Sequence, residues 1–218
     1  MKNIPRIFVG ENISVGDIIP AGRETAHYLR RVMRTNQCLV FGNGNEYSAV
    51  LSDDDKSLVI GDKTQHCDPS GDLTLMFAPI KRTDDLINMA TQMGVKILQP
   101  VICERTTAHH INWERMQKIV IEAAEQSNRN SIPKIMQPIK FADLDLSKVV
   151  FADERAAYGK DLKANIKNAK SILVGPEGGF SDNEFSQLDN AGAVGISLGK
   201  TILRAEVAAV VAIAKITE

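Results

Sequence analysis

The sequence predicts an α/β protein in two parts, a small N-terminal β-barrel followed by a larger α/β domain with a parallel sheet. Up to about Asp68, short β-like runs are broken by turn-forming residues, as in small barrels. From Leu73 onward strands and helices alternate, which is typical of a parallel sheet covered by helices. The turn-forming cluster at 68–72 marks the change, so we expect domains at residues 1–68 and 72–218.

The composition excludes several classes of protein. Of the 218 residues 44% are hydrophobic, enough for a packed core, and 26 basic residues nearly balance 27 acidic ones. No apolar run approaches the ~20 residues of a membrane span, and no export signal is visible, so we expect a soluble, cytoplasmic protein. Cys38, Cys67 and Cys103 are odd in number and widely spaced, and His109 and His110 would point to opposite faces of a strand. We therefore expect neither disulfides nor a metal.

In the N-terminal part the pattern predicts four strands and one helix. The strands are expected at residues 6–9, 37–41, 47–51 and 57–60. The helix is expected at residues 24–34. The spacing of its apolar and basic residues predicts an apolar face toward the core and a basic face toward solvent. The inward residues are Leu29, Val32 and Met33, and the outward ones are Arg30, Arg31 and Arg34.

In the C-terminal part five strands alternate with five helices. The strands are expected at 73–78, 96–103, 149–152, 171–174 and 194–198. The helices are expected at 84–93, 113–127, 161–169, 182–190 and 204–216. The fourth helix has a clear start signal, because Ser181 can cap it while Glu184 reaches back in a capping box.

Two glycine-bearing turns, at 173–180 and 198–204, each follow a buried-looking strand. Ligands of open parallel sheets bind beyond the carboxyl ends of the strands, so both turns are expected to build one pocket. Gly178 and Gly179 lack a Cβ, which lets the backbone approach a flat purine closely. The alternative is a merely tight connection from strand to helix.

The second turn also contains Gly195 to Thr201, which approaches a phosphate-binding P-loop. That motif needs four residues between its glycines, whereas three stand here between Gly195 and Gly199. Nucleotide hydrolysis is therefore a minor alternative, which predicts magnesium-dependent binding of a nucleoside triphosphate.

An ordered set of segments resembles the RsmE family of 16S rRNA uracil-N3 methyltransferases, within the SPOUT class of S-adenosylmethionine enzymes. These segments are residues 4–8, His27 with 30–34, 94–95, 104–105, 122–130 with 132–133, 175–179, and 198–199 through 202–204 with Glu206. The resemblance covers most of the chain.

This resemblance implies a PUA-like N-terminal barrel for RNA, a C-terminal domain with a deep trefoil knot, and a homodimer. It implies S-adenosylmethionine as methyl donor, no metal, and 16S rRNA as substrate, within the small ribosomal subunit. The positions that inherit donor binding are Leu173, Gly175, Glu177, Gly178, Gly179, Leu198, Gly199, Ile202, Leu203 and Arg204.

The chemistry of such a transfer gives two residues a candidate catalytic part. Uracil N3 must lose a proton, so a carboxylate or water is wanted near the pocket, and an arginine would stabilise the developing anion. Arg204 and Glu206 stand where this could happen. The alternative for Glu206 is a simple interaction with the helix dipole, and Glu177 has a similar ambiguity between base and turn stabiliser.

Candidate RNA contacts can also be read from local charge. Residues 1–34 are rich in basic side chains, and Arg30 and Arg34 would share one face of an α-helix. A solvated helix face is the alternative. The candidates are Arg6, Arg23, Arg30, Arg31, Arg34 and, farther along the chain, Arg129.

The chain departs from the family at several side chains, which puts RNA docking and catalytic detail in question more than donor binding. Met89 and Gln92 stand where a lysine and a glutamate are usual. Near the second turn the departures are Lys200, Thr201, Ala205 and Val207. Two alternatives follow, a SPOUT methyltransferase for another RNA nucleoside and a catalytically impaired RNA-binding homologue.

Overall fold

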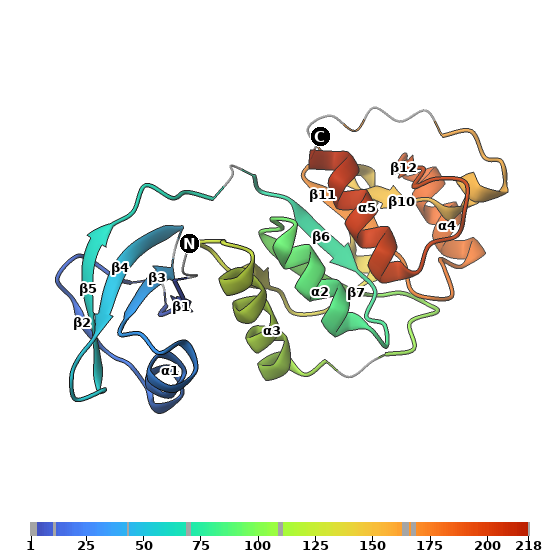
Figure 1. The fold of residues 1–218 in the computed structure, drawn as a ribbon. Coiled ribbons are helices and arrows are strands. Elements are labelled where there is room, and N and C mark those ends of the chain that lie inside the picture. Colours follow the sequence, from blue (N-terminus) through green and yellow to red (C-terminus); the bar gives the residue numbers. More distant parts are fainter. Residues whose placement is uncertain are drawn as a thin grey trace. The chain divides into compact units, whose positions relative to one another are not determined.

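The computed structural model describes residues 4–10, 12–42, 44–68, 71–108, 111–162, 166 and 169–217. The chain divides into two compact units (Figure 1). Unit 1 comprises Met1–Ser70 and Ile121–Ile132, and unit 2 comprises Gly71–Val120 and Pro133–Glu218. The segment 121–132, expected in the C-terminal domain, thus groups with the N-terminal one.

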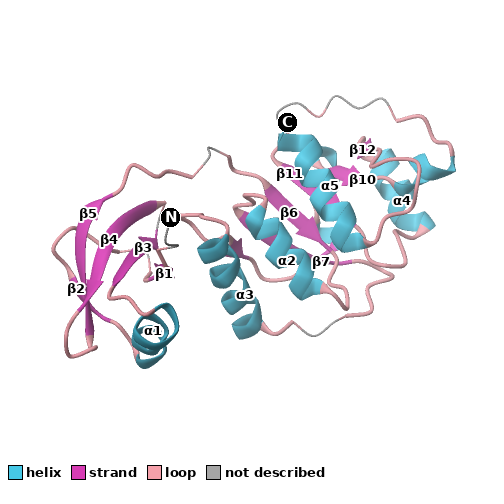
Figure 2. Ribbon diagram, viewed as in Figure 1, coloured by secondary structure: helices cyan, strands magenta, loops and turns pink. Residues whose placement is uncertain are grey.

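Unit 1 is built on a curled, mostly antiparallel sheet in the strand order β1-β3-β4-β5-β2 (Figure 2). Its strands are β1 (Arg6–Phe8), β2 (Ile18–Pro20), β3 (Gln37–Gly42), β4 (Asn45–Leu51) and β5 (Ser57–Lys63). Side chains alternate along β4, so that Tyr47, Ala49 and Leu51 enter the core. β1 and β3 are parallel, and no ladder between β1 and β2 closes the sheet among the described residues.

The helix expected at 24–34 spans 23–33 and changes its winding. It is the α-helix α1 (Arg23–His27) followed by a π-helical segment, η1 (Tyr28–Met33), and Arg34 ends it with a left-handed φ of 53°. A π-helix bonds residue i to i+5 and therefore rotates each later side chain away from its α-helical direction. Leu29 is fully buried, as predicted, but Val32 is 60% exposed, and the prediction that it faces inward is wrong.

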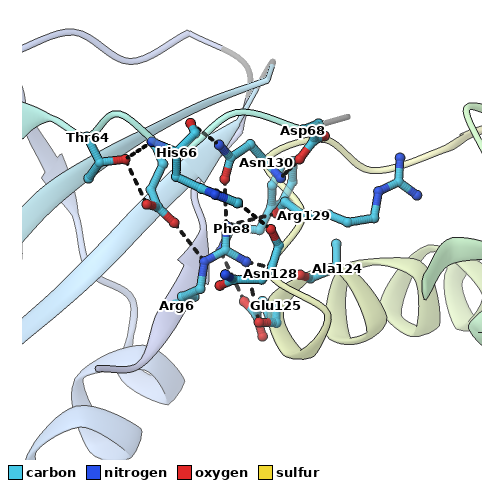
Figure 3. Close-up of polar contacts among 11 residues, drawn as sticks. Arg6, Phe8, Thr64, His66, Asp68, Ala124, Glu125, Asn128, Arg129 and Asn130 are labelled. Atoms are coloured by element: carbon cyan, nitrogen blue, oxygen red, sulfur yellow. Dashed lines mark hydrogen bonds and ion pairs between the residues drawn. The ribbon is translucent and has the colours of Figure 1, made fainter. Parts of the chain in front are cut away.

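A buried arginine joins β1 to the end of helix α3 (Trp113–Gln126) within unit 1 (Figure 3). Arg6 Nε donates to Glu46 Oε2 at 2.8 Å, and both side chains are about 95% buried. The remaining guanidinium nitrogens donate to the carbonyls of Ala124 (3.1 Å) and Arg129 (3.0 Å) and to Asn130 Oδ1 (2.6 Å). Arg6 thus supplies donors to a helix end whose last carbonyls have no partner within the helix.

His66 and Asp68 also bind the end of this helix. His66 Nε2 lies 2.6 Å from the carbonyl oxygen of Asn128, whose φ of 64° ends the helix, and Asn130 Nδ2 donates to the His66 carbonyl (Figure 3). Asp68 Oδ1 accepts from the backbone N–H of Asn130. These contacts explain why 121–132 belongs to unit 1.

Unit 2 contains a seven-stranded parallel sheet in the order β12-β10-β11-β6-β7-β8, with β9 beside β7. Its strands are β6 (Thr74–Phe77), β7 (Ile97–Ile102), β8 (Lys134–Ile135), β9 (Ile139–Lys140), β10 (Val150–Ala152), β11 (Ser171–Val174) and β12 (Val194–Ile196). The parallel sheet predicted from the strand and helix alternation is confirmed. β8 and β9 were not predicted, because two residues carry no readable period.

Three helices of unit 2 bear on the site: α2 (Thr83–Gln92), α4 (Asp182–Asn190) and α5 (Ala205–Thr217). α2 and α5 pack against each other, and α5 also contacts β6 and β11 (Figure 1). The predicted capping box of α4 is confirmed, since Ser181 and Glu184 bond reciprocally. Short 3-10 turns complete the unit: η2 (Phe141–Asp143), η3 (Leu146–Lys148) and η4 (Glu154–Tyr158).

Some expectations fall on parts of the chain that are not described. The helix expected at 161–169 includes 163–165 and 167–168, which lie outside the described residues, and the residues described beside them are not helical. His109 and His110 also lie outside. Within the described ranges, no helix is long and apolar enough to cross a membrane.

Candidate active site

A cavity of about 410 Å³ opens in unit 2 beyond the carboxyl ends of β10, β11 and β12. Its walls come from three segments, each following one of these strands, 152–157, 174–180 and 198–208, together with Arg82. This is where open parallel sheets bind ligands, and the volume is that of a site for a small molecule.

Most residues expected to bind a ligand line this cavity, but three do not. The lining includes Gly175, Glu177, Leu198, Gly199, Ile202, Leu203 and Arg204. Leu173 is fully buried in the core behind it. Gly178 and Gly179 are also outside the lining.

The first glycine turn is shaped by contacts with the protein itself. A Cβ on Gly175 would lie 3.1 Å from the Phe180 ring, and a Cβ on Gly179, whose φ is 69°, would lie 2.1 Å from Glu154 Oε1. Arg105 Nη1 donates to the carbonyls of Gly178 (3.0 Å) and Phe180 (3.2 Å). Glycine is needed here because Phe180 and Glu154 pack directly on the backbone.

Asp153 lines the cavity and is held by two basic side chains behind it. Arg155 binds Asp153 Oδ2 at 2.7 Å and Asp189 Oδ2 at 2.8 Å, and Lys160 Nζ lies 3.3 Å from each carboxylate. Burial alone would raise the pKa of Asp153, but the hydrogen bonds from Arg155 and the charges of Arg155 and Lys160 together outweigh it and hold the pKa below its ordinary value. Asp153 is therefore a fixed anion rather than a proton acceptor.

Glu154, the next residue, lines the cavity without an ion pair among the described residues. Burial, with the nearby charge of Asp153, raises the pKa of its carboxyl group. No local pattern pointed to Asp153 and Glu154, because they belong to no recognisable motif and become site residues only through the strand order.

The two expected catalytic residues have different surroundings. Arg204 is exposed on the cavity wall and lies just before α5, because its carbonyl accepts the first helical bond, from the Ala208 N–H at 2.8 Å. Glu206 is only 4% exposed and accepts a hydrogen bond from Arg82 Nη1 at 3.0 Å. Arg82 was not expected in the site.

The RNA candidates separate into buried and exposed arginines. Arg6 and Arg129 are only 8% and 5% exposed, so little of either side chain is open to RNA. Arg30 is paired with Asp55 at 2.6 Å. Arg34 does not share a helix face with Arg30, because it follows a π-helix in a left-handed conformation. The exposed candidates are Arg23, Arg31 and Arg34.

The departures from the family pattern are spread over α2 and the second glycine turn. Thr201 and Ala205 line the cavity, whereas Lys200 and Val207 do not. Met89 and Gln92 lie on α2, away from the cavity wall. Within the part of the chain that is described, no cluster of three or more potential metal ligands occurs.

Comparison with known proteins shows the family of the chain. A family model for the RNA methyltransferase domain matches residues 67–217. The chain belongs to this RNA methyltransferase family.

Relatives extend the match over both units. The ribosomal RNA small subunit methyltransferase E of Rickettsia conorii is 34% identical, over 97% of this chain and 94% of its own length. The Neisseria gonorrhoeae enzyme of the same name, solved with bound S-adenosyl methionine, is 28% identical with a TM-score of 0.81, covering 99% of this chain and 97% of its own. A probable rRNA methyltransferase from Porphyromonas gingivalis is 26% identical with a TM-score of 0.80, covering 98% and 97%.

Proposed function

We propose that this family member transfers a methyl group from S-adenosylmethionine to N3 of a uridine in the 16S rRNA of the small ribosomal subunit. The observation that carries the proposal is the cavity at the carboxyl ends of β10, β11 and β12, built by the two glycine turns. The Neisseria relative, which binds this donor, has the same fold over 99% of the chain.

The residues of the cavity fit the donor. Leu198, Ile202 and Leu203 offer apolar surface for a flat purine, and the turns at 174–180 and 198–204 offer backbone amide and carbonyl groups. Glu154 and Glu177 add negative charge suited to a cationic sulfonium compound. When bound, the donor supplies an electrophilic methyl group.

The residues of this chain position the reacting groups and stabilise the charge that develops. Methyl transfer is an in-line displacement, so rigid walls that align the uracil nitrogen with the methyl group supply much of the acceleration. We assign Arg204, on the cavity wall, to the developing negative charge of the uracil. Glu206 is buried and accepts a hydrogen bond from Arg82, so we assign the N3 proton to water at the cavity mouth.

Unit 1 is proposed to be a PUA-like RNA-binding domain. Its exposed arginines on α1 and η1, Arg23, Arg31 and Arg34, would contact phosphates. In the same proposal unit 2 carries the trefoil knot of the SPOUT class, and the chain acts as a cytoplasmic homodimer. The family resemblance supports these points, as does the match of the Rickettsia relative over 97% of the chain.

The test is methylation of purified small ribosomal subunits that lack the modification, with labelled S-adenosylmethionine and nucleoside analysis of the RNA. We expect 3-methyluridine. Another methylated nucleoside would move the enzyme to a different target, and donor binding without transfer would indicate a catalytically impaired homologue.

The RNA surface has a separate test. Charge reversal of Arg31 and Arg34 should lower RNA affinity and flatten its dependence on salt. Each phosphate contact releases counterions when it forms, so binding with fewer contacts releases fewer of them. An unaltered salt slope would remove this surface from the RNA interface.

A further inference from the structure

Arg82 lies between two hollows of unit 2. It lines the cavity, and it also lines a shallower groove of about 350 Å³ along α2. The groove, called here the α2 groove, is formed by Arg82, Asp84, Asp85, Asn88, Met89, Arg115 and Ile119. Of the residues lining these two hollows, Arg82 alone lines both, so its side chain borders the cavity and the α2 groove together.

Two carboxylates hold the Arg82 guanidinium in place. Glu206, from α5, accepts from Nη1 at 3.0 Å, and Asp85, from α2, accepts from Nε at 2.7 Å and lies 2.7 Å from Nη2. The hydrogen bonds engage two of the five N–H groups of the guanidinium. The Glu206 side chain is 5% exposed, whereas that of Arg82 is 52% exposed. The buried carboxylate thus fixes a cation whose remaining donors are open to a substrate.

We propose that Arg82 is a catalytic residue that stabilises the negative charge on the uracil oxygens, and that Glu206 is the positioning residue that holds it. The proposal rests on the proposed function. In the step concerned, the N3–H proton passes to water, N3 forms a bond to the methyl carbon, and the carbon–sulfur bond breaks with its electron pair left on sulfur. Negative charge develops on O2 and O4 before the new bond is complete.

The physical reason is preorganisation. A donor fixed beforehand stabilises developing charge without reorganising during the reaction, which is what makes such groups effective. Arg82 is fixed from two helices that pack against each other, α2 and α5. The Glu206 carboxylate is buried and in contact with the guanidinium, so its contribution passes through Arg82.

The experiment compares Arg82→Gln with Lys81→Gln in the full-length protein. Lys81 is the preceding residue, is exposed, and lines neither hollow, so its variant removes the same charge without touching the site. With small subunits as substrate, we expect Arg82→Gln to lower kcat on the order of 10²-fold. Lys81→Gln should stay within about twofold, and the affinity of both variants for S-adenosylhomocysteine, measured by calorimetry, should be unchanged.

Substrates containing 5-fluorouracil separate charge stabilisation from binding. Fluorine makes N3–H more acidic, so the uracil anion needs less stabilisation by the protein. The decrease in kcat caused by Arg82→Gln should therefore shrink to about tenfold. A variant defective in donor or RNA binding would show no such rescue. Thermal unfolding of each variant checks that the fold is retained.

The role of Glu206 is tested by coupling. Glu206→Gln should lower kcat less than Arg82→Gln does. The double variant should be no slower than Arg82→Gln alone, because both substitutions act through the same positioned guanidinium. Additive losses would overturn the positioning role.

Other outcomes overturn the assignment of Arg82. Parallel loss of S-adenosylhomocysteine affinity would make Arg82 a donor ligand, and a flatter salt dependence of RNA affinity would make it a phosphate contact. An unchanged kcat would remove it from the reaction. A wild-type protein that transfers no methyl group to uracil would instead overturn the proposed function, and this proposal with it.

Discussion

Substituting alanine for Gly179 tests how the first glycine turn builds the cavity wall. The backbone at Gly179 has a φ of 69°, a left-handed conformation that costs an alanine about 1–2 kcal/mol. The new Cβ would also lie 2.1 Å from Glu154 Oε1 and 2.8 Å from Glu154 Cδ. Because these atoms end a flexible side chain, Glu154 should swing away instead of the backbone moving, which adds little to the loss of stability.

We therefore expect Gly179→Ala to lower the free energy of unfolding by about 1–2 kcal/mol. For a chain of this size each kcal/mol lowers the melting temperature by about 2–4 °C. The displaced Glu154 carboxylate should also alter the cavity, and we expect S-adenosylmethionine to bind about tenfold more weakly, which corresponds to about 1.4 kcal/mol. Differential scanning fluorimetry and calorimetric titration measure the two effects.

Gly178→Ala is the matched control. A Cβ at Gly178 would lie 3.6 Å from the Cβ and Cδ of Arg105, an ordinary contact, and the φ of Gly178 is not left-handed. Its melting temperature and donor affinity should be close to those of the wild type. In the Gly179→Ala/Glu154→Ala variant the collision is gone but the strained φ remains, so the stability loss should persist. Equal effects at Gly178 and Gly179 would refute the reasoning.

Two further predictions concern the ion pairs. Arg6→Ala leaves the buried Glu46 carboxylate without its cation, and we expect the free energy of unfolding, measured in urea, to fall by about 3–5 kcal/mol. Unchanged stability would contradict a structural role for this buried ion pair. Hydrogen bonds from Arg155 lower the pKa of Asp189 from 3.8 to about 2. Because the pKa of the folded state is depressed, this stabilisation is present above about pH 4 and is lost as the pH falls toward 2. Asp189→Asn should therefore flatten the acid limb of the melting-temperature profile. Asp189 is half exposed, so its contribution to stability is modest. An acid limb as steep as that of the wild type would contradict the pairing.

Local signals in the sequence were sufficient for much of the fold. The helix predicted at 182–190 has those bounds in the structure, because Ser181 and Glu184 complete its cap within one turn. Both glycine turns were located, since turn chemistry and the preceding apolar runs are written in neighbouring residues. The winding of η1 was missed, because the spacing of apolar residues does not distinguish a π-turn that Arg34 closes.

Local patterns of residues thus predict the alternation of elements, the parallel sheet and the two turns that form the cavity. What each charged side chain does depends on the folded structure. Arg6 and Glu46 are 40 residues apart, and Arg82 and Glu206 are 124 apart, yet each pair is in hydrogen-bond contact. An arginine has the same propensity and charge whether it meets phosphate, carboxylate or water. Its partner is set by burial and strand order, which bring together groups that no local pattern connects.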